Sequence, residues 1–190
     1  MKKISLSIKW LACVATACMA FSAQAQECLV RLDQTEVDYG VASHERDSQR
    51  NLKNGMVGLG RKPLSLNISC PNPQAMQLTL EAAAGGSNEF RFANKGRYAV
   101  AIGAATLDGR EVHLAYARGG RPVLDTVSKW KRFGMDANIV PVRDGKVEMG
   151  KNFSAKLWVE ARIPREELIV KQQEYFNGYG RIVVDALNPL

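Results

Sequence analysis

Apolar residues alternate with polar or small residues in five stretches of the chain, which is the two-residue period of a half-buried β-strand. The alternating sets are Leu64, Leu66, Ile68 and Cys70; Met76, Leu78, Leu80 and Ala82; Val112, Leu114 and Tyr116; Phe153, Ala155, Leu157, Val159 and Ala161; and Ile182, Val184 and Ala186. Every second side chain of such a strand lies on the same face of a sheet. We therefore expect a β-rich fold.

Dipeptides that tolerate a positive φ stand between these stretches: Asn54-Gly55, Gly85-Gly86, Asp108-Gly109, Gly119-Gly120, Asp144-Gly145 and Asn177-Gly178. The two Asp-Gly pairs predict tight hairpin turns. The one helical signal is short, since Pro164 suits a first helical position and Glu166 and Glu167 suit the positive end of a helix dipole. We expect it to be a connector. The pattern predicts an all-β, immunoglobulin-like antiparallel sandwich.

The amino terminus has the three parts of a cleavable signal peptide. Basic residues precede an uncharged run over residues 10–22, and the small-residue triplet Ala23-Gln24-Ala25 follows it. The run is shorter than the roughly 20 apolar residues that span a bilayer. We expect residues 1–25 to be removed and residues 26–190 to form one domain; lipoprotein processing at Cys13 or Cys18 is the less favoured alternative.

Export changes the interpretation of the cysteines and of the charge. Cleavage would leave Cys28 and Cys70 as a pair in an oxidising compartment, which favours a disulfide over two buried thiols or a metal pair. It would also lower the formal charge from +7 to +4, because three of the 26 basic residues and none of the 19 acidic residues are removed. The mature domain is therefore expected to be only mildly basic.

A glycine cluster at Gly55, Gly58 and Gly60 superficially resembles a phosphate-binding loop. Its spacing is G-x-x-G-x-G and no strand-turn-helix pattern follows it, so we interpret it as a mobile loop. The next strand is expected to begin after Pro63.

Catalytic motifs are missing from residues 26–190, which contain no G-x-S-x-G, H-E-x-x-H, Walker or C-x-x-C sequence. We expect His44 to be a solvated loop residue and His113 to face outward from a strand, and both are far in sequence from the cysteines. The sequence therefore predicts no enzyme, no cofactor and no metal site.

Five basic residues gather around one tryptophan, namely Arg118, Arg121, Lys129, Lys131 and Arg132 around Trp130. Such a region could bind acidic glycans or a membrane surface. A solvated charged loop with one packed tryptophan is the favoured alternative. Nucleic acid is not an expected partner of an exported domain.

Two segments carry a family resemblance: CLVRLDQTEVDYG, from Cys28 to Gly40, and PLSLNISC, from Pro63 to Cys70. Together they resemble the amino-terminal half of chaperone-usher fimbrial subunits. The VDYG element, Val37 to Gly40, is similar to a branch known only as a domain of unknown function. The likeness covers about residues 28–82 and continues more loosely to a closing strand, Gly180 to Leu187.

The resemblance implies a pilin-like, incomplete sandwich that lacks the final strand of the immunoglobulin fold. Its open edge, expected at Ile182, Val184 and Ala186, would receive a strand from a periplasmic chaperone and then from a neighbouring subunit. The implied partners are that chaperone, an outer-membrane usher, neighbouring subunits and a receptor on a host or other surface. The implied location is a cell-surface fimbrium of a Gram-negative cell, reached through the periplasm.

Two features depart from the family. The chain ends in Asn188-Pro189-Leu190 where pilins have an alternating strand with an aromatic residue next to last. Only Gln26 and Glu27 separate the expected cleavage site from Cys28, a span of at most about 7 Å, so we expect a subunit that accepts a strand and stands at the fibre tip. The alternatives are a free-standing secreted or periplasmic binding module with a complete sandwich and, least favoured, an unrecognised periplasmic enzyme.

Overall fold

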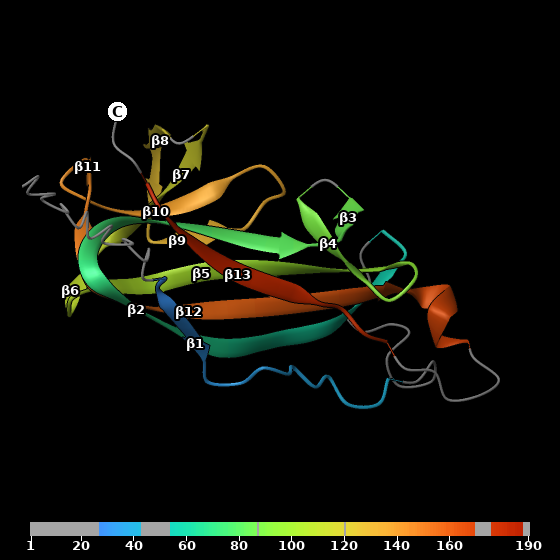
Figure 1. Cartoon of the computed structure of the whole chain (residues 1–190). Helices are drawn as coiled ribbons and strands as arrows, with labels where there is room; N and C mark the ends of the chain where they lie inside the picture. The colour runs from blue at the N-terminus through green and yellow to red at the C-terminus, as the bar shows by residue number, and fades with distance from the viewer. Residues whose placement is uncertain (1–26, 43–53, 87, 120, 170–175, 188–190) are drawn as a thin grey trace, which may run out of the picture.

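The computed structural model describes residues 27–42, 54–86, 88–119, 121–169 and 176–187, and antiparallel β-structure dominates them (Figure 1). The strands are β1 (Leu29–Leu32), β2 (Met56–Ala82), β3 (Ala84–Gly86), β4 (Glu89–Phe92), β5 (Gly96–Leu107), β6 (Arg110–Glu111), β7 (His113–Arg118), β8 (Arg121–Ser128), β9 (Trp130–Arg132), β10 (Asn138–Arg143), β11 (Lys146–Val147), β12 (Met149–Pro164) and β13 (Gly180–Ala186). The expected signal peptide and His44 lie outside the described residues.

The strand β2 belongs to both layers of the fold. Its first part pairs with β1 and β12, and its last part, Met76 to Ala82, pairs with β13. In Figure 1 β2 runs along the lower layer, turns back at the left and returns along the upper layer. The register with β12 shifts after Ser69, where the sequence Pro71-Asn72-Pro73 follows. Prolines suit this interruption of the pairing because proline has no backbone N–H to donate to a neighbouring strand.

The two layers are antiparallel sheets joined through β2. The first sheet has the order β1, β2, β12, β5, with β4 and β3 beyond β5 and with β6 and β9 also paired to β5. The second sheet has the order β13, β2, β10, β7, β8, with β11 paired to β10. This is the antiparallel sandwich-like, all-β fold that the sequence pattern predicted.

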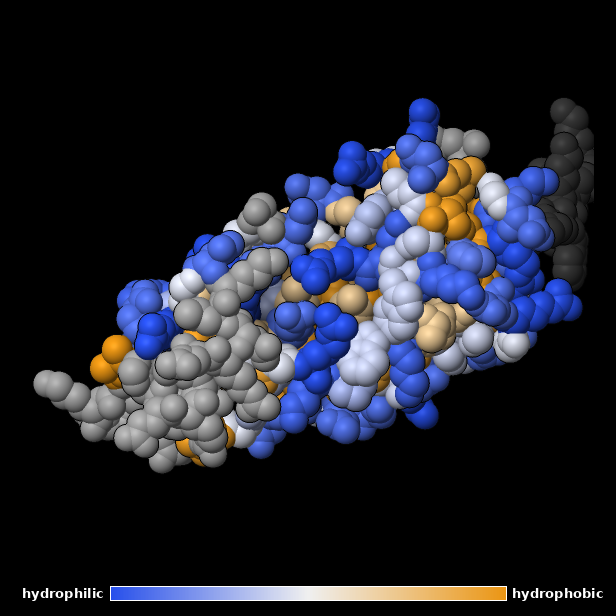
Figure 2. Space-filling model, turned by 180° about the vertical axis from the view of Figure 1, so that it is seen from behind, coloured by the Kyte–Doolittle hydropathy of each residue, from blue (hydrophilic) through white to orange (hydrophobic). Residues whose placement is uncertain are grey.

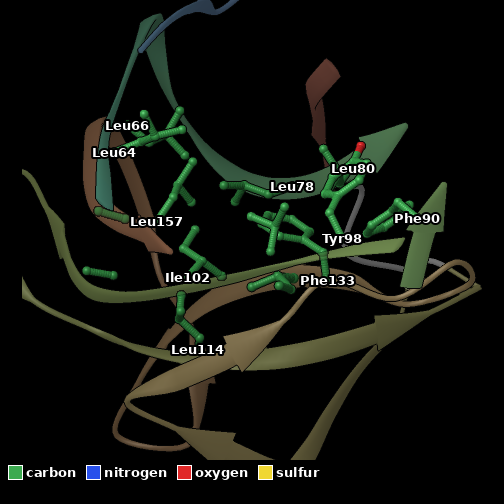
Figure 3. Close-up of a cluster of buried hydrophobic side chains, with 14 of the residues drawn as sticks. Leu64, Leu66, Leu78, Leu80, Phe90, Tyr98, Ile102, Leu114, Phe133 and Leu157 are labelled. Carbon is green, nitrogen blue, oxygen red and sulfur yellow. The ribbon is translucent and has the colours of Figure 1, made fainter. Parts of the chain in front are cut away.

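The hydrophobic core lies between the layers and draws side chains from strands far apart in the sequence. Figure 3 shows them pointing toward one another: Leu64, Leu66, Leu78, Leu80, Phe90, Tyr98, Ile102, Leu114, Phe133 and Leu157. All ten are buried. Seen from behind, the surface is mostly hydrophilic, with smaller apolar groups between the polar ones (Figure 2). The inward residues of the predicted alternations therefore form this core.

Both predicted Asp-Gly hairpins are confirmed. Asp108 and Gly109 have φ values of 48° and 77°, and they join Leu107 to its partner Arg110. Asp144 and Gly145, with φ values of 49° and 73°, connect β10 and β11 in the same way. Two successive positive φ angles define the type I′ turn, whose twist matches that of the strands it connects.

The expectation of a mobile loop at the glycine cluster is wrong, because β2 begins at Met56 and runs through Pro63. Gly58 and Gly60 therefore lie inside a strand. In the pairing with β12, Gly60 lies opposite Ala161 and Gly58 opposite Arg162, so Leu59 is the extra residue of a bulge. Gly60 has a φ of +101°, which suits glycine at such an irregularity. Pro63 is tolerated because β1 pairs with β2 only from Leu66 onward.

Of two smaller expectations, one changes. The helical connector is a single 3-10 turn, η1 (Arg165–Leu168), and Pro164 precedes it as the N-cap residue instead of occupying its first position. His113 is half-buried in β7, opposite Val142 of β10. It alternates along β7 with the buried core residue Leu114, so its side chain lies on the face of the sheet away from the main core, as expected.

The predicted disulfide between Cys28 and Cys70 is present, with a Cα–Cα distance of 4.2 Å. It joins the start of β1 to the bend of β2, one residue beyond the pairing of Leu29 with Ser69. The amide of Gln74 donates to Cys28 Sγ at 2.7 Å, so the bend is also fixed from its far side. The disulfide thus ties the first strand to the corner at which the two sheets meet.

Candidate functional site

The last strand, β13, is paired on one side only within the described part of the chain. Its seven residues pair with β2 in an unbroken antiparallel register from Gly180 opposite Ala82 to Ala186 opposite Met76. In Figure 1 this strand, coloured red, runs across the front of the molecule. Such an edge presents a row of backbone N–H and C=O groups that another strand could pair with.

The first strand, β1, is the facing edge of the other sheet. Its four residues pair with β2 from Leu29 opposite Ser69 to Leu32 opposite Leu66, and no described strand pairs with its other side. β1 and β13 approach each other. This side of the sandwich therefore has two neighbouring strand edges that no described strand covers.

Four apolar side chains of these two strands are only partly buried, although they pack against the core: Val30, Leu32, Ile182 and Val184. We call this set the β1–β13 seam. Residues of β2 that share the same core, such as Leu66 and Leu78, are fully buried. The seam is thus a place where the core reaches the surface between the two sheets.

Residues 33–42, which follow β1, form no strand but are held against the first sheet. Asp33 accepts a hydrogen bond from the Ser65 N–H at 2.8 Å, which lowers the pKa of the Asp33 carboxyl. Tyr39 donates its hydroxyl to the Val159 carbonyl at 2.9 Å, and its ring meets the Phe92 ring edge-on at 6.3 Å. Burial raises the pKa of Tyr39 to about 12. These contacts hold residues 33–42 in place beside β2.

The three edge residues predicted from the sequence all lie on β13. Ile182 and Val184 are half-buried members of the seam, whereas Ala186 is exposed. Val183 is also half-buried, so burial on this strand does not alternate as cleanly as the sequence suggested. Sequence analysis missed Val30 and Leu32; the short alternation in LVRL was the available signal.

The basic region divides between two structural settings. Arg118 and Arg121 are exposed and lie opposite each other at the hairpin between β7 and β8. Lys129 forms an ion pair with Glu111 at 3.2 Å. The hairpin arginines and Lys129 therefore have different surroundings.

The short strand β9 separates the remaining three. Lys131 lies 4.7 Å from the centre of the Tyr116 ring and donates to the Thr126 carbonyl, and burial lowers the pKa of this lysine. Trp130 and Arg132 point to the opposite face, because neighbouring residues of a strand alternate. The structure therefore does not gather the six predicted residues into one patch.

A hollow of about 430 Å³ lies where β13 begins. Its charged residues include Glu81 and Arg181, which pair at 2.7 Å, and the hydrogen bond and charge of Glu81 raise the pKa of Arg181. Much of the remaining lining is alanine or glycine. Arg91 is the third charged residue of the lining. Because these residues indicate no particular ligand, we assign the hollow no role of its own.

Other site types find no support in the described ranges. Those residues contain no group of three or more His, Cys, Asp or Glu side chains able to hold a metal ion. They also contain no helix with the length and apolar character needed to cross a membrane. Comparisons with models of protein families and with curated proteins found no match for this chain. The edge at β13 is the candidate site.

Proposed function

We propose that the protein is a non-enzymatic structural or adhesive subunit of a chaperone-usher fimbria, and that it accepts a partner's strand along β13. The observation that carries the proposal is the pairing of β13, the last described strand, on one side only. An added strand would lie beside β13, next to β1, which is where the seventh strand of an immunoglobulin-like sandwich would complete the fold.

The edge supplies both affinity and selectivity for a strand. Seven residues of β13 correspond to about 23 Å of extended chain, so a donor of similar length could pair along all of it. Main-chain hydrogen bonds would provide affinity without regard to sequence. The half-buried seam residues Val30, Leu32, Ile182 and Val184 would favour a donor with apolar residues at alternate positions, because those side chains would cover them.

The resemblance of Cys28–Gly40 and Pro63–Cys70 to fimbrial subunits supplies the biological setting of the proposal. In that setting the donors are a periplasmic chaperone and then a neighbouring subunit, and an outer-membrane usher assembles the fibre. The protein would pass through the periplasm to the cell surface. A tip position belongs to the same proposal and rests on the expected cleavage after Ala25. Amino-terminal sequencing of the exported protein tests that cleavage, and a mature start near Thr16 would contradict it.

A peptide experiment tests the strand-accepting edge directly. The chain from Gln26 onward is titrated with an alternating apolar–polar peptide of about a dozen residues, and with a scrambled peptide of the same composition. We expect the alternating peptide to raise the unfolding temperature by several degrees, because it binds only the folded state. The scrambled peptide should have no effect. Reversible unfolding at high temperature that neither peptide alters would instead favour a self-complete binding module.

A cross-linking experiment tests the position of the partner. A photo-activated amino acid replaces Asp185, which is exposed on β13, or Arg110, which is exposed on β6 at the opposite edge of the first sheet. The two variants are expressed with a fimbrial chaperone and irradiated. We expect a covalent adduct from position 185 and none from position 110. Equal adducts from both positions would contradict docking along β13.

A further inference from the structure

The outer face of the first sheet carries a trough whose floor is a row of small residues. Ala99, Ala101 and Gly103 lie at alternate positions of β5, on the face opposite the buried Val100 and Ile102. Because side chains alternate along a strand, the three small residues all point outward. A central strand with almost no side chain on this face leaves a depression between its neighbours.

Tryptophan and charged side chains form the two walls. On one side, β12 places Trp158 opposite Ala101 and Glu160 opposite Ala99. On the other side, β9 places Arg132 opposite Ala101 and Trp130 opposite Gly103. These residues and Arg61 of β2 line a hollow of about 360 Å³, of which Ala99 and Ala101 form the floor.

The Trp130 indole is seated directly on Gly103. A Cβ atom built on Gly103 would lie 2.2 Å from Cδ2 and 2.3 Å from Cε3 of Trp130, so only glycine permits this contact. Trp130 nevertheless keeps 44% of its surface exposed. The ring is therefore held in place from below while part of it stays available to a ligand.

Among the described residues, the charged groups of the trough do not balance. Arg61 donates to Glu160 at 3.3 Å, so these two groups largely satisfy each other. At the next register, Arg97 and Arg162 both pair with Glu89. No carboxylate of the described residues pairs with the Arg132 guanidinium. Arg61, Arg132 and Glu160 together therefore give the trough a formal charge of +1.

We propose that this trough binds an acidic sugar unit of a glycan. The C–H face of a pyranose ring is apolar and would pack on the exposed part of the Trp130 indole and on the half-buried indole of Trp158. Both indoles combine a large apolar surface with little conformational freedom. The sugar carboxylate would pair with Arg132, whose planar guanidinium matches a carboxylate in two-point hydrogen bonding. Glu160 and Arg61 would accept and donate hydrogen bonds at the ring hydroxyls.

The site is independent of the strand-accepting edge. The trough lies on the outer face of β5, β9 and β12, whereas the seam lies between the edges of β1 and β13. Sugar binding therefore does not require an added strand, and failure of either proposal leaves the other standing.

Intrinsic fluorescence reports on the trough alone. The chain has three tryptophans, and one of them, Trp10, falls in the expected signal peptide, so a chain starting at Gln26 contains only Trp130 and Trp158. This chain is titrated with glucuronic acid, N-acetylneuraminic acid, methyl glucoside and N-acetylglutamate. We expect a saturable emission change with at least one of the two acidic sugars, and at least tenfold weaker binding of methyl glucoside and of N-acetylglutamate.

Variants separate the role of charge from that of fold. Arg132→Gln should weaken binding of the acidic sugar at least tenfold and leave binding of methyl glucoside unaffected. The control Arg118→Gln, at the β7–β8 hairpin and outside the lining of the trough, should leave the binding of both sugars unchanged. Trp158→Ala should weaken binding of both the acidic sugar and methyl glucoside. The emission of the remaining Trp130 measures this binding. The proposal is overturned if neither acidic sugar gives a saturable change, if N-acetylglutamate binds as well as the sugars, or if Arg132→Gln retains full affinity.

Discussion

The carboxylate of Glu89 on β4 pairs with the guanidinium of Arg162 on β12, across the intervening strand β5. Arg97 of β5 lies 3.8 Å from the same carboxylate. Glu89 is the one charged residue of the described chain that is buried. A single carboxylate thus links three successive strands of the first sheet.

Replacing this carboxylate should destabilise the fold. Glu89→Ala leaves two guanidinium groups without their partner, and because both remain partly exposed the cost should be about 2 kcal/mol, less than for a fully buried pair. Glu89→Gln keeps an acceptor and should lose about half as much. Urea denaturation measures both, with Glu111→Ala, at an exposed ion pair, as the control. Equal stabilities of Glu89→Ala and the control would contradict this assignment.

Two tyrosines should make stability fall at high pH. Burial raises the pKa of Tyr39 and of Tyr98 to about 12, above the ordinary value of 10.0. Between pH 10 and 12 the unfolded chain loses these protons while the folded chain retains them, so the free energy of unfolding decreases through that window. Below pH 10 the contribution is fully present. Denaturation at several pH values measures how steeply the free energy of unfolding falls with pH. This slope should be shallower in the Tyr39→Phe/Tyr98→Phe variant, and an unchanged slope would mean that these two tyrosines do not cause the fall.

The disulfide should contribute substantially to stability. It closes a loop of 42 residues, for which the chain-entropy account gives about 4 kcal/mol. The Cys28→Ser/Cys70→Ser variant should lose a large part of this, and the single variant Cys28→Ser should behave similarly. Mass spectrometry of the chain from Gln26 onward, without reductant, should find no free thiol at either position. Two free thiols, or a double variant as stable as the parent, would be incompatible with the assignment.

The contact between Gly103 and Trp130 predicts a local and selective effect. Gly103→Ala should displace the indole, because the added methyl group would overlap the ring. We expect a shift of tryptophan emission and weaker binding of an acidic sugar. Ala101→Gly, which only deepens the neighbouring floor position, is the control and should leave the emission unchanged. Emission of Gly103→Ala identical to that of the parent would mean that the ring does not rest there.

The sequence predicted the strands whose two faces differ in polarity. Leu64 to Cys70 and Phe153 to Ala161 alternate because one face meets the core and the other meets water. The Asp-Gly hairpins were predictable for a local reason, since only a few residue types adopt two successive positive φ angles.

The strands that sequence analysis missed do not show that contrast. In β5, the outward-facing residues are alanine and glycine, so they do not contrast in polarity with the apolar residues on the inner face. Gly103 is required there because the Trp130 indole lies directly on it. In β10, Ile139 to Val142 are all buried, since Ile139 faces the main core and Val140 and Val142 belong to a second apolar cluster. A continuous apolar run carries no period from which a strand could be inferred.

The candidate sites depended on pairing that no local pattern contains. Trp130 and Trp158 meet the same face of β5 only because β9 and β12 flank it, and the sequence gives no sign of that register. The basic residues around Trp130 were grouped by proximity in sequence, whereas alternation along β9 turns Lys131 away from Arg132. The interpretation of β13 as an open edge came from the family resemblance and not from the pattern of apolar residues, and it stays a prediction.

The disulfide also determines how the domain would carry a pulling force. β1 has only four residues and pairs on one side, so tension applied ahead of Cys28 would otherwise detach it one hydrogen bond at a time. The covalent link passes that tension to Cys70, at the bend of the one strand shared by both sheets. We expect single-molecule stretching to give a high unfolding force that drops sharply in reductant; an unchanged force would place the mechanical clamp elsewhere. In the proposed fimbria, tension along the fibre would pass through this corner.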